Sequence, residues 1–301
     1  MPSLTNRYDL PKSLVNAASK FKYSRGAAEY SVTTLIDSPR IARLKARHES
    51  ELTEDISDNM FRLLGSALHL LVEKSADETE QSEERLFTTV DGTTISGGVD
   101  IQHEAGGQTI IGDYKVTSAY AVMSGKPEWE NQLNCYAYLV EKEKGIKPTA
   151  LYIYAVIRDW TARKLSENNY PVAPVVKIPI NLWTFEKRES YIRRRVAAHK
   201  MADEDTQCTD ADRWLTPTKW AVIKGGQKRA LRVLQTPEEA ADVCKKNPGS
   251  RIERREGNAI RCSGNYCSVA GHCSQWRRYQ ESSGSHAEGD GIDFFSGEAG
   301  S

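Results

Sequence analysis

Residues 86–116 have the sequence LFTTVDGTTISGGVDIQHEAGGQTIIGDYKV, and this stretch decides the fold. The DG at 91–92 is a dipeptide typical of two-residue hairpin turns, and the AGG at 105–107 marks a second turn. The stretch therefore predicts three successive strands. Asp100 and Asp113 then lie on adjacent antiparallel strands about 4.8 Å apart, so side chains on one face can share an ion.

Two helices are predicted on the amino-terminal side of this stretch. Ser31 suits an N-cap or turn before a helical segment at 32–48, where Pro39 suits the first turn of a helix. A second helix is predicted at 59–77. Its apolar residues fall near one stripe: Phe61, Leu64, Leu68, Leu71 and Val72. The polar run DETEQSEE at 77–84 is predicted to be a loop.

Further helices and strands follow the three strands. The predicted elements are a helix at 127–145, a strand at 150–159, a strand at 175–183 and a helix at 184–203. The strand at 150–159 is almost wholly apolar, as expected in the interior of a sheet. Beyond residue 208 the predicted elements are a hairpin at 220–234, a short helix at 236–247 and a strand at 250–257.

This order predicts an α/β protein with a mixed central sheet flanked by helices and a small α+β unit after it. The predicted divisions are an irregular lead-in at 1–30, a main domain at 31–207, a cysteine-bearing unit at 208–280 and a disordered acidic tail at 281–301. The tail contains GDGIDFF, which is a candidate docking peptide for a recombination or replication protein. A merely solubilising end is the alternative.

The composition predicts a folded protein without a membrane span. Of 301 residues 39% are hydrophobic, and no run of eighteen apolar residues occurs. The amino terminus does not have the pattern of a secretion signal, so we expect a cytoplasmic protein with reduced thiols. Residues 51–110 hold thirteen acids against three bases, whereas residues 181–280 hold twenty bases against twelve acids. This asymmetry fits a surface that grips phosphates beside one that holds metal ions, although ordinary solvated faces also produce it.

Asp100, Asp113 and Lys115 form a candidate catalytic set. Lys115 follows Asp113 by two residues, so both side chains emerge on the same face of a strand. Mg²⁺ and Mn²⁺ prefer carboxylate and carbonyl oxygens, and an adjacent ammonium can orient a water and offset developing charge. For the triplet DYK alone, an ordinary surface ion pair is an equal alternative.

Two more motifs flank this set. Gly65-x-x-x-His69 lies on the preceding helix, and Gln132-x-x-x-Tyr136 lies on the following one. With these motifs in this order, residues 31–157 resemble the RecB-like branch of the PD-(D/E)XK nucleases. The resemblance implies a restriction-endonuclease-like core and hydrolysis of phosphodiester bonds.

The resemblance also implies roles for single residues. It implies a set of ligands for Mg²⁺ or Mn²⁺: His69, Asp100, Asp113 and the main-chain carbonyl of Tyr114. Gln132 and Tyr136 would hold Lys115 or the DNA backbone in place. We therefore expect a DNA exonuclease of phage recombination or DNA processing. A catalytically silent DNA-binding or assembly protein, and an RNA-processing nuclease on the same fold, are the alternatives.

Three of the six cysteines are close in sequence, in a C-x4-C-x5-C pattern: Cys262, Cys267 and Cys273. Three soft ligands at this spacing suit zinc or an iron–sulfur cluster. The pattern resembles RecB-like nucleases such as the CRISPR-adaptation nucleases, in which a cysteine upstream of the core completes a [4Fe–4S] cluster. Together with CTDADRW at 208–214 and AVIKGGQKRALRV at 221–233, it also resembles phage RecB-type nucleases. Here Ser38 stands at that upstream position, and Cys208 is the predicted substitute. Zinc, iron–sulfur and metal-free thiols all stay open; Cys135 and Cys244 are predicted core residues.

Basic and aromatic residues are candidates for contact with nucleic acid. The predicted phosphate contacts are Arg193, Arg194, Arg195, Lys224, Lys228, Arg229 and Arg232. Trp214 and Trp220 are candidates for stacking on bases, although burial is the commoner use of tryptophan. No sequence-reading motif is evident, so we expect non-specific binding to single- or double-stranded DNA in a bacterial cell or a phage-infected host. A ring-shaped oligomer would explain processive cleavage.

Overall fold

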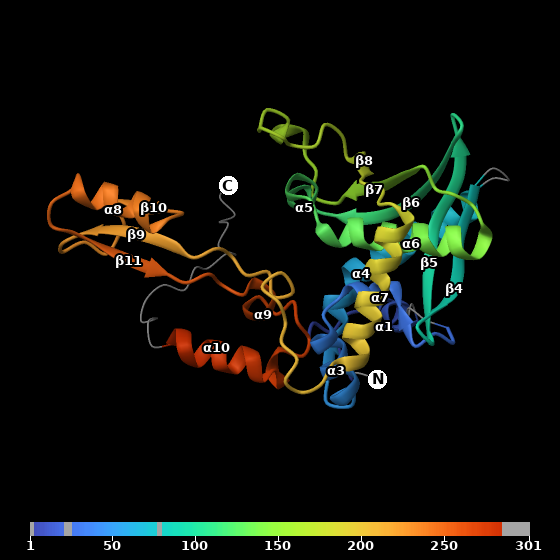
Figure 1. Cartoon of the computed structure of the whole chain (residues 1–301), viewed down its shortest axis with the longest axis horizontal. Coiled ribbons are helices and arrows are strands. Elements are labelled where there is room, and N and C mark those ends of the chain that lie inside the picture. The colour runs from blue at the N-terminus through green and yellow to red at the C-terminus, as the bar shows by residue number, and fades with distance from the viewer. Residues whose placement is uncertain (1–2, 21–25, 77–79, 285–301) are drawn as a thin grey trace. The chain divides into compact units, whose positions relative to one another are not determined.

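The computed structural model describes residues 3–20, 26–76 and 80–284 (Figure 1). The chain divides into two compact units, Met1–Thr206 and Gln207–Ser301. Within the described parts of the chain, no helix is long and apolar enough to cross a membrane.

A six-stranded mixed sheet forms the centre of the larger unit (Figure 1). Its strands are β2 (Tyr30–Ser31), β4 (Glu80–Val90), β5 (Thr93–Ala105), β6 (Gln108–Thr117), β7 (Ala150–Ile157) and β8 (Val175–Ile180). β5 pairs antiparallel with β4 along one edge, and β2 and β6 share its other edge. β7 is parallel to β6, and β8 is antiparallel to β7. The mixed central sheet and the three strands predicted around residues 86–116 are therefore confirmed.

Helix α6 contributes the largest part of the hydrophobic core of this unit. The helices of this unit are α1 (Lys12–Lys20), α2 (Val32–Ile36), α3 (Pro39–Arg47), α4 (Met60–Ser75), α5 (Ala119–Ser124), α6 (Pro127–Lys144) and α7 (Phe185–Met201). α6 packs against β4, β5, β6, β7 and β8, and its central residues are buried. Gly145 ends the helix in the left-handed conformation (φ 70°), which suits glycine. The core cluster joins α6 to β5, β6 and β7, the strands next to the predicted site.

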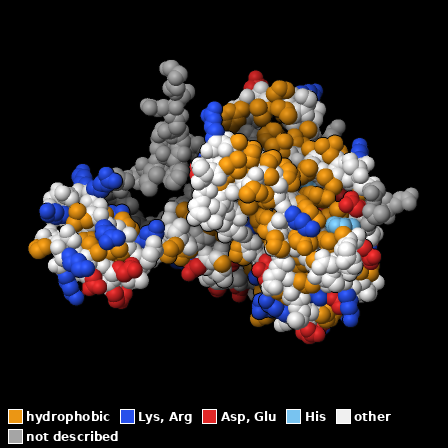
Figure 2. All heavy atoms as spheres, turned by 90° about the horizontal axis from the view of Figure 1, so that it is seen from above, with side chains coloured by type: hydrophobic (Ala, Val, Ile, Leu, Met, Phe, Trp, Pro, Cys, Tyr) orange, Lys and Arg blue, Asp and Glu red, His pale blue; other side chains and the backbone are white. Residues whose placement is uncertain are grey.

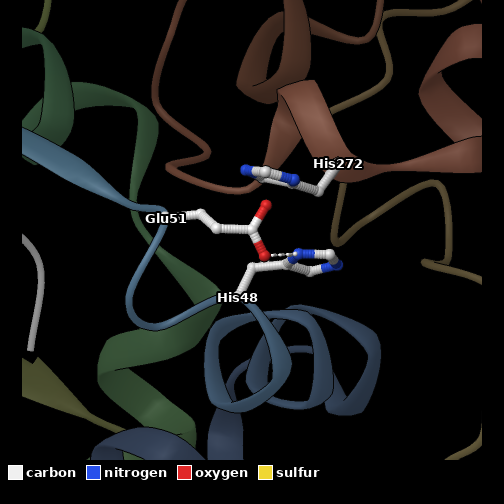
Figure 3. Close-up of side chains that lie close together, drawn as sticks. All are labelled: His48, Glu51 and His272. Atoms are coloured by element: carbon white, nitrogen blue, oxygen red, sulfur yellow. Dashed lines mark hydrogen bonds and ion pairs between the residues drawn. The ribbon is translucent and has the colours of Figure 1, made fainter.

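The helix predicted at 32–48 is divided into α2 and α3. Ser31 caps α2 as predicted, because its Oγ accepts a hydrogen bond of 3.1 Å from the Thr34 amide. The break follows from Pro39, whose ring disfavours the helical conformation at the preceding residue; Ser38 has φ −60° and ψ 128°. After α3, His48 Nδ1 lies 2.8 Å from Glu51 Oε1 in the turn that ends the helix (Figure 3).

Two predictions of irregular structure are wrong. The lead-in at 1–30 contains α1 and β1 (Ser3–Thr5), and β1 pairs in parallel with β3 (Thr53–Asp55). The loop predicted at 77–84 is a strand from residue 80 onward, because β4 begins there. Its acids are tolerated because β4 is an edge strand. The remaining short elements of the unit are the 3₁₀ turns η1 (Ile56–Asn59) and η2 (Ala162–Lys164).

The apolar stripe of α4 does not enter the core. The exposed fractions are 59% for Phe61, 52% for Leu64 and 65% for Leu71, and none of the described residues of α4 is buried. Leu68 and Val72 of the stripe are half-buried, and α4 turns another set of side chains, which includes His69, toward a cleft. Figure 2 shows apolar side chains over a wide area of one face of the larger unit.

The smaller unit is built on a three-stranded antiparallel sheet. Its elements are β9 (Lys219–Lys224), β10 (Arg232–Leu234), α8 (Pro237–Lys245), β11 (Ser250–Arg255), α9 (Ile260–Ser263), η3 (Ala270–His272) and α10 (Ser274–Gly284). The strand order is β10-β9-β11, which confirms the predicted hairpin, short helix and strand. The tail predicted from residue 281 is helical up to Gly284, because α10 continues to that residue. The rest of the predicted tail, GDGIDFF included, lies outside the described residues.

Candidate active site

A cleft of about 560 Å³ in the larger unit contains the predicted catalytic residues. Residues of α4, β4, β5, β6 and α6 line it, among them Asp100, Asp113, Lys115, Gln132 and Tyr136. His69 and Gly65 of the preceding motif line the same cleft. Gly65 and His69 are more than sixty positions from Gln132 and Tyr136 in the sequence, and the fold brings all four residues to this cleft.

The register of the sheet explains why the two aspartates meet. The β5–β6 ladder runs from Ala105 opposite Gln108 to Ile101 opposite Gly112. Asp100 and Asp113 are the next two positions in this register, where the ladder has ended. The freed amide of Tyr114 donates a hydrogen bond of 2.9 Å to Asp100 Oδ2 instead of to a strand carbonyl. The strands therefore separate where the two carboxylates stand.

Asp113 is held by two partners from different elements. It is 1% exposed, and its Oδ2 lies 2.6 Å from Lys115 Nζ on the same strand. Gln132 Nε2 donates to Asp113 Oδ1 at 3.1 Å and to Tyr136 Oη at 2.7 Å. Gln132 and Tyr136 are one turn apart on α6, so both face the sheet. The resemblance implied that Gln132 contacts Lys115 or DNA. In the structure its side-chain amide donates a hydrogen bond to Asp113 instead.

The third acid of the site is Glu83, which sequence reasoning missed. Its Oε1 lies 2.7 Å from His69 Nδ1, and Asp100 Oδ2 lies 3.6 Å from the same nitrogen. Glu83 could not be singled out from the sequence, because it lies in the acidic run at 77–84, where apolar and polar residues do not alternate as they do in a half-buried strand. It is placed in the cleft by β4, the strand that pairs with the other edge of β5.

The charges of the site are strongly coupled. Burial raises the pKa of Asp100 well above its usual range, and the neighbouring Asp113 raises it further. The hydrogen bond to Glu83 raises the pKa of His69 against the effect of burial. Burial alone would lower the pKa of the Lys115 ammonium, but Asp113 and Asp100 outweigh it and raise that pKa. These charges favour the protonated form of Lys115 beside the two carboxylates.

The donor set fits a hard divalent cation. Asp100 is 7% exposed, so the site holds two buried carboxylates in immediate proximity. Buried carboxylates repel each other unless a cation lies between them, and a carboxylate pair with a histidine suits Mg²⁺ or Mn²⁺. Tyr114, whose carbonyl is the predicted main-chain ligand, also lines the cleft.

Four cysteines of the smaller unit lie around α9, η3 and the start of α10: Cys208, Cys262, Cys267 and Cys273. Cys273 is buried, and Cys208, Cys262 and Cys267 are half-buried. Burial raises the pKa of the Cys262 thiol, and the nearby thiols of Cys267 and Cys273 raise it further. Gln275 joins Cys208 to the start of α10, because its Oε1 accepts from the Cys208 amide at 2.8 Å and its Nε2 donates to the Cys208 carbonyl at 2.9 Å.

The other two cysteines have surroundings that fit plain packing. Cys135 is 1% exposed within α6, and burial raises its pKa to about 12. Cys244 is half-buried in α8, and its Sγ lies 3.3 Å from the Ser250 carbonyl oxygen. Neither thiol lines the cleft of the larger unit.

The predicted phosphate contacts on α7 are not all available. Arg195 Nε donates to the Leu35 carbonyl at 2.7 Å, and its guanidinium also binds the Asp37 carbonyl, so this residue holds the end of α2. Arg193 is paired with Asp91 and Glu189. Arg194 lies over the ring of Tyr191, 5.5 Å from its centroid. Arg195 is therefore a structural residue, because helix ends need donors for their free carbonyls.

The basic residues of the β9–β10 hairpin have a different setting. The side chains predicted there to contact phosphate are all exposed: Lys224, Lys228, Arg229 and Arg232. Trp220 is half-buried on β9, and Trp214 is 38% exposed. Trp214 contacts local partners: the Tyr266 ring centroid lies 5.3 Å from its own at a tilt of 50°, and Arg261 Cζ lies 5.5 Å from it.

Three comparisons relate the chain to known proteins. The sequence profile of the PD-(D/E)XK nuclease superfamily matches residues 27–274. Among solved structures, the chain is similar to one described as "Crystal structure of SSO0001", with 20% identity, coverage of 67% of this chain and 86% of that chain, and a TM-score of 0.45. No curated protein gives a significant match. The profile match extends over most of the chain and includes every residue of the cleft, and on that basis the chain belongs to the PD-(D/E)XK nuclease superfamily.

Proposed function

We propose that this chain is a Mg²⁺- or Mn²⁺-dependent DNA nuclease that removes nucleotides from DNA ends. Membership of the superfamily indicates a metal-dependent nuclease. The observation that carries the proposal is the contact set of Asp113, which combines a buried carboxylate, a lysine at 2.6 Å and a glutamine at 3.1 Å beside Asp100. A decayed site would be expected to have lost part of this set.

Each residue of the site has a role in the proposed reaction. Asp100, Asp113, the carbonyl of Tyr114 and, beside Asp100, His69 would supply the metal ligands. The cation, when bound, polarises the phosphate and lowers the pKa of a water that attacks phosphorus. Lys115 offsets the charge that develops in the transition state and orients the attacking water. Gln132 holds Asp113 in its orientation through the hydrogen bond to Oδ1.

The proposed substrate and context extend the sequence argument. The exposed lysine and arginine side chains of the β9–β10 hairpin support binding to the DNA backbone without sequence preference. We assign the activity to phage recombination or DNA processing in the cytoplasm of a bacterial or phage-infected cell. The acidic tail would recruit a recombination or replication protein, and a ring of several copies would keep the enzyme on DNA.

The cysteines of the smaller unit are proposed to bind Zn²⁺ or a [4Fe–4S] cluster. Cys262, Cys267 and Cys273 provide three ligands, and Cys208 provides the fourth in place of the upstream position occupied by Ser38. The pairing of Gln275 with the backbone of Cys208 supports this assignment, because it ties Cys208 to a residue only two positions after Cys273. Metal binding there would contribute directly to folding of the unit.

The test is digestion of end-labelled linear and closed-circular DNA, single- and double-stranded, with Mg²⁺, Mn²⁺ or EDTA. We expect metal-dependent loss of linear DNA and sparing of circles. Asp113→Asn should lower the rate by about two or more orders of magnitude, whereas the exposed Asp58→Asn should cleave like wild type. DNA binding without cleavage in Mn²⁺ would reassign the chain as a binding protein, and preference for RNA would reassign the substrate.

A further inference from the structure

We propose that Glu83 is a metal ligand, and that it gives the active site a second cation position on the side of Asp100 away from Asp113. The proposal rests on the metal-dependent nuclease function proposed above. It adds a residue from β4, outside the motifs that identify the catalytic set.

The sheet places three acids in one row. The β4–β5 ladder pairs Ser82 with Ile101 and Glu84 with Val99, and Glu83 and Asp100 lie between these two pairs. By the register of the β5–β6 ladder, Asp113 follows on the next strand, just beyond the last pair. The side chains of all three acids line the same cleft. They therefore define two adjacent gaps, Glu83–Asp100 and Asp100–Asp113, and sites with two metal ions place those ions about 3.5–4 Å apart.

His69 marks the first of these gaps. One ligand atom each of His69, Glu83 and Asp100 lies within 4.8 Å of the other two. The group that meets this criterion does not include Asp113, which belongs to the second gap with Asp100 and the carbonyl of Tyr114. Asp100 stands between the gaps and can contribute an oxygen to each.

Burial and charge indicate that the first gap needs a cation. Asp100 faces the cleft, is 7% exposed and lies next to two other carboxylates, whereas Lys115 contacts the far one, Asp113. His69 Nδ1 lies 2.7 Å from Glu83 Oε1 and 3.6 Å from Asp100 Oδ2, so one nitrogen and two carboxylate oxygens converge on this gap. Glu83 reaches this place from a left-handed backbone conformation (φ 50°), which is unfavourable for a residue with a Cβ.

The alternative role for Glu83 is to orient His69 without touching metal. Glu83→Gln separates the two roles, because glutamine has the same shape and can still hydrogen bond to His69 but is a far poorer metal ligand. Glu73→Gln is the matched control: Glu73 lines the same cleft from α4, but it does not belong to the three-residue metal group. Both variants remove one negative charge from the cleft.

The experiment is a Mn²⁺ titration of the full chain, with free Mn²⁺ measured by its electron paramagnetic resonance signal. We expect Glu83→Gln to bind one Mn²⁺ fewer per chain than wild type, and Glu73→Gln to bind the same number as wild type. Any Mn²⁺ at the cysteines is common to all three proteins and cancels in the difference. Circular dichroism and thermal unfolding of each variant check that the fold is kept.

Two results would overturn the proposal. If Glu83→Gln binds as many Mn²⁺ ions as wild type, or wild type binds only one at this site, Glu83 is a positioning residue. In that case Asp113→Asn still abolishes cleavage and the nuclease function stands. If Asp113→Asn cleaves DNA like wild type, the nuclease assignment of the cleft fails first, whatever the Mn²⁺ stoichiometry.

Discussion

Replacement of Gln132 by methionine removes the amide that holds Asp113 and leaves the shape of the side chain nearly unchanged. In the structure this amide donates to Asp113 Oδ1 at 3.1 Å and to Tyr136 Oη at 2.7 Å. Gln132 is 7% exposed and Tyr136 3% exposed, so bulk water has little access to replace the lost donor. The carboxylate would keep Lys115 as a partner but lose its fixed orientation.

The size of the effect follows from the kind of hydrogen bond that is lost. A hydrogen bond to a charged group is worth about 1.5–3 kcal/mol, and each 1.4 kcal/mol is a factor of ten. Gln132→Met should therefore weaken the binding of the catalytic cation by about 10- to 150-fold. This range agrees with the losses of about 10- to 100-fold seen when groups that orient metal ligands are removed.

Two measurements test this prediction. One is the Mn²⁺ concentration at half-maximal cleavage of linear DNA, and the other is the Mn²⁺ affinity without DNA. Tyr136→Phe is the control. It removes the hydroxyl that accepts a hydrogen bond from Gln132, which is a bond between neutral groups, and keeps the bond from Gln132 to Asp113. The Mn²⁺ affinity should therefore fall by only about 2- to 10-fold. An unchanged Mn²⁺ dependence in Gln132→Met, with normal folding, would refute the role assigned to this hydrogen bond.

Three further predictions concern stability. Gly97→Ala places a Cβ 2.6 Å from a side-chain carbon of α6 and should destabilise the fold by about 1–3 kcal/mol in urea unfolding, whereas Gly98→Ala, with its nearest atom at 3.7 Å, should be close to neutral; equal effects would contradict the packing. Hydrogen bonds, first from the Ser57 side chain, hold the pKa of Asp55 well below its usual range, so its contribution to stability is present at neutral pH and is lost as pH falls through that lowered pKa. Asp55→Ala should thus lower the Tm at pH 7, and the difference should shrink toward pH 2; a difference that is constant with pH would exclude this linkage. Cys208→Ser should reduce the zinc or iron content and the Tm of the purified protein, whereas Cys244→Ser should leave the metal content unchanged; full metal content in Cys208→Ser would remove Cys208 from the ligand set.

The parts of the fold that depend on local pattern could be predicted from sequence. The DG and AGG turns and the apolar runs between them predicted three strands, and their alternation brought Asp113 and Lys115 to one face. The pairing of Asp100 with Asp113 followed from the same turns, because a hairpin turn sets the register of both strands. These features need no knowledge of distant contacts.

The parts that depend on tertiary context could not be predicted. Glu83 lies in an acidic run without strand periodicity, and only the pairing of β4 with β5 brings it to His69. The stripe of α4 had the spacing of a buried face, but Leu64 and Leu71 are exposed because the helix turns toward the cleft. Arg195 lies in a run of three arginines that predicted contact with phosphate, but its guanidinium donates to the carbonyls at the end of α2 instead.

The two walls of the cleft differ in how firmly the rest of the protein holds them. β6 is paired with β7 at eight successive positions from Ile110 to Thr117, so Asp113 and Lys115 cannot shift without breaking a continuous ladder at the centre of the sheet. α4, by contrast, carries His69 on a helix none of whose described residues is buried. Local opening is therefore far less costly for the histidine wall than for the aspartate wall. In the proposed nuclease, α4 is thus the wall that a bound nucleic acid can displace, while Asp113 and Lys115 keep their spacing.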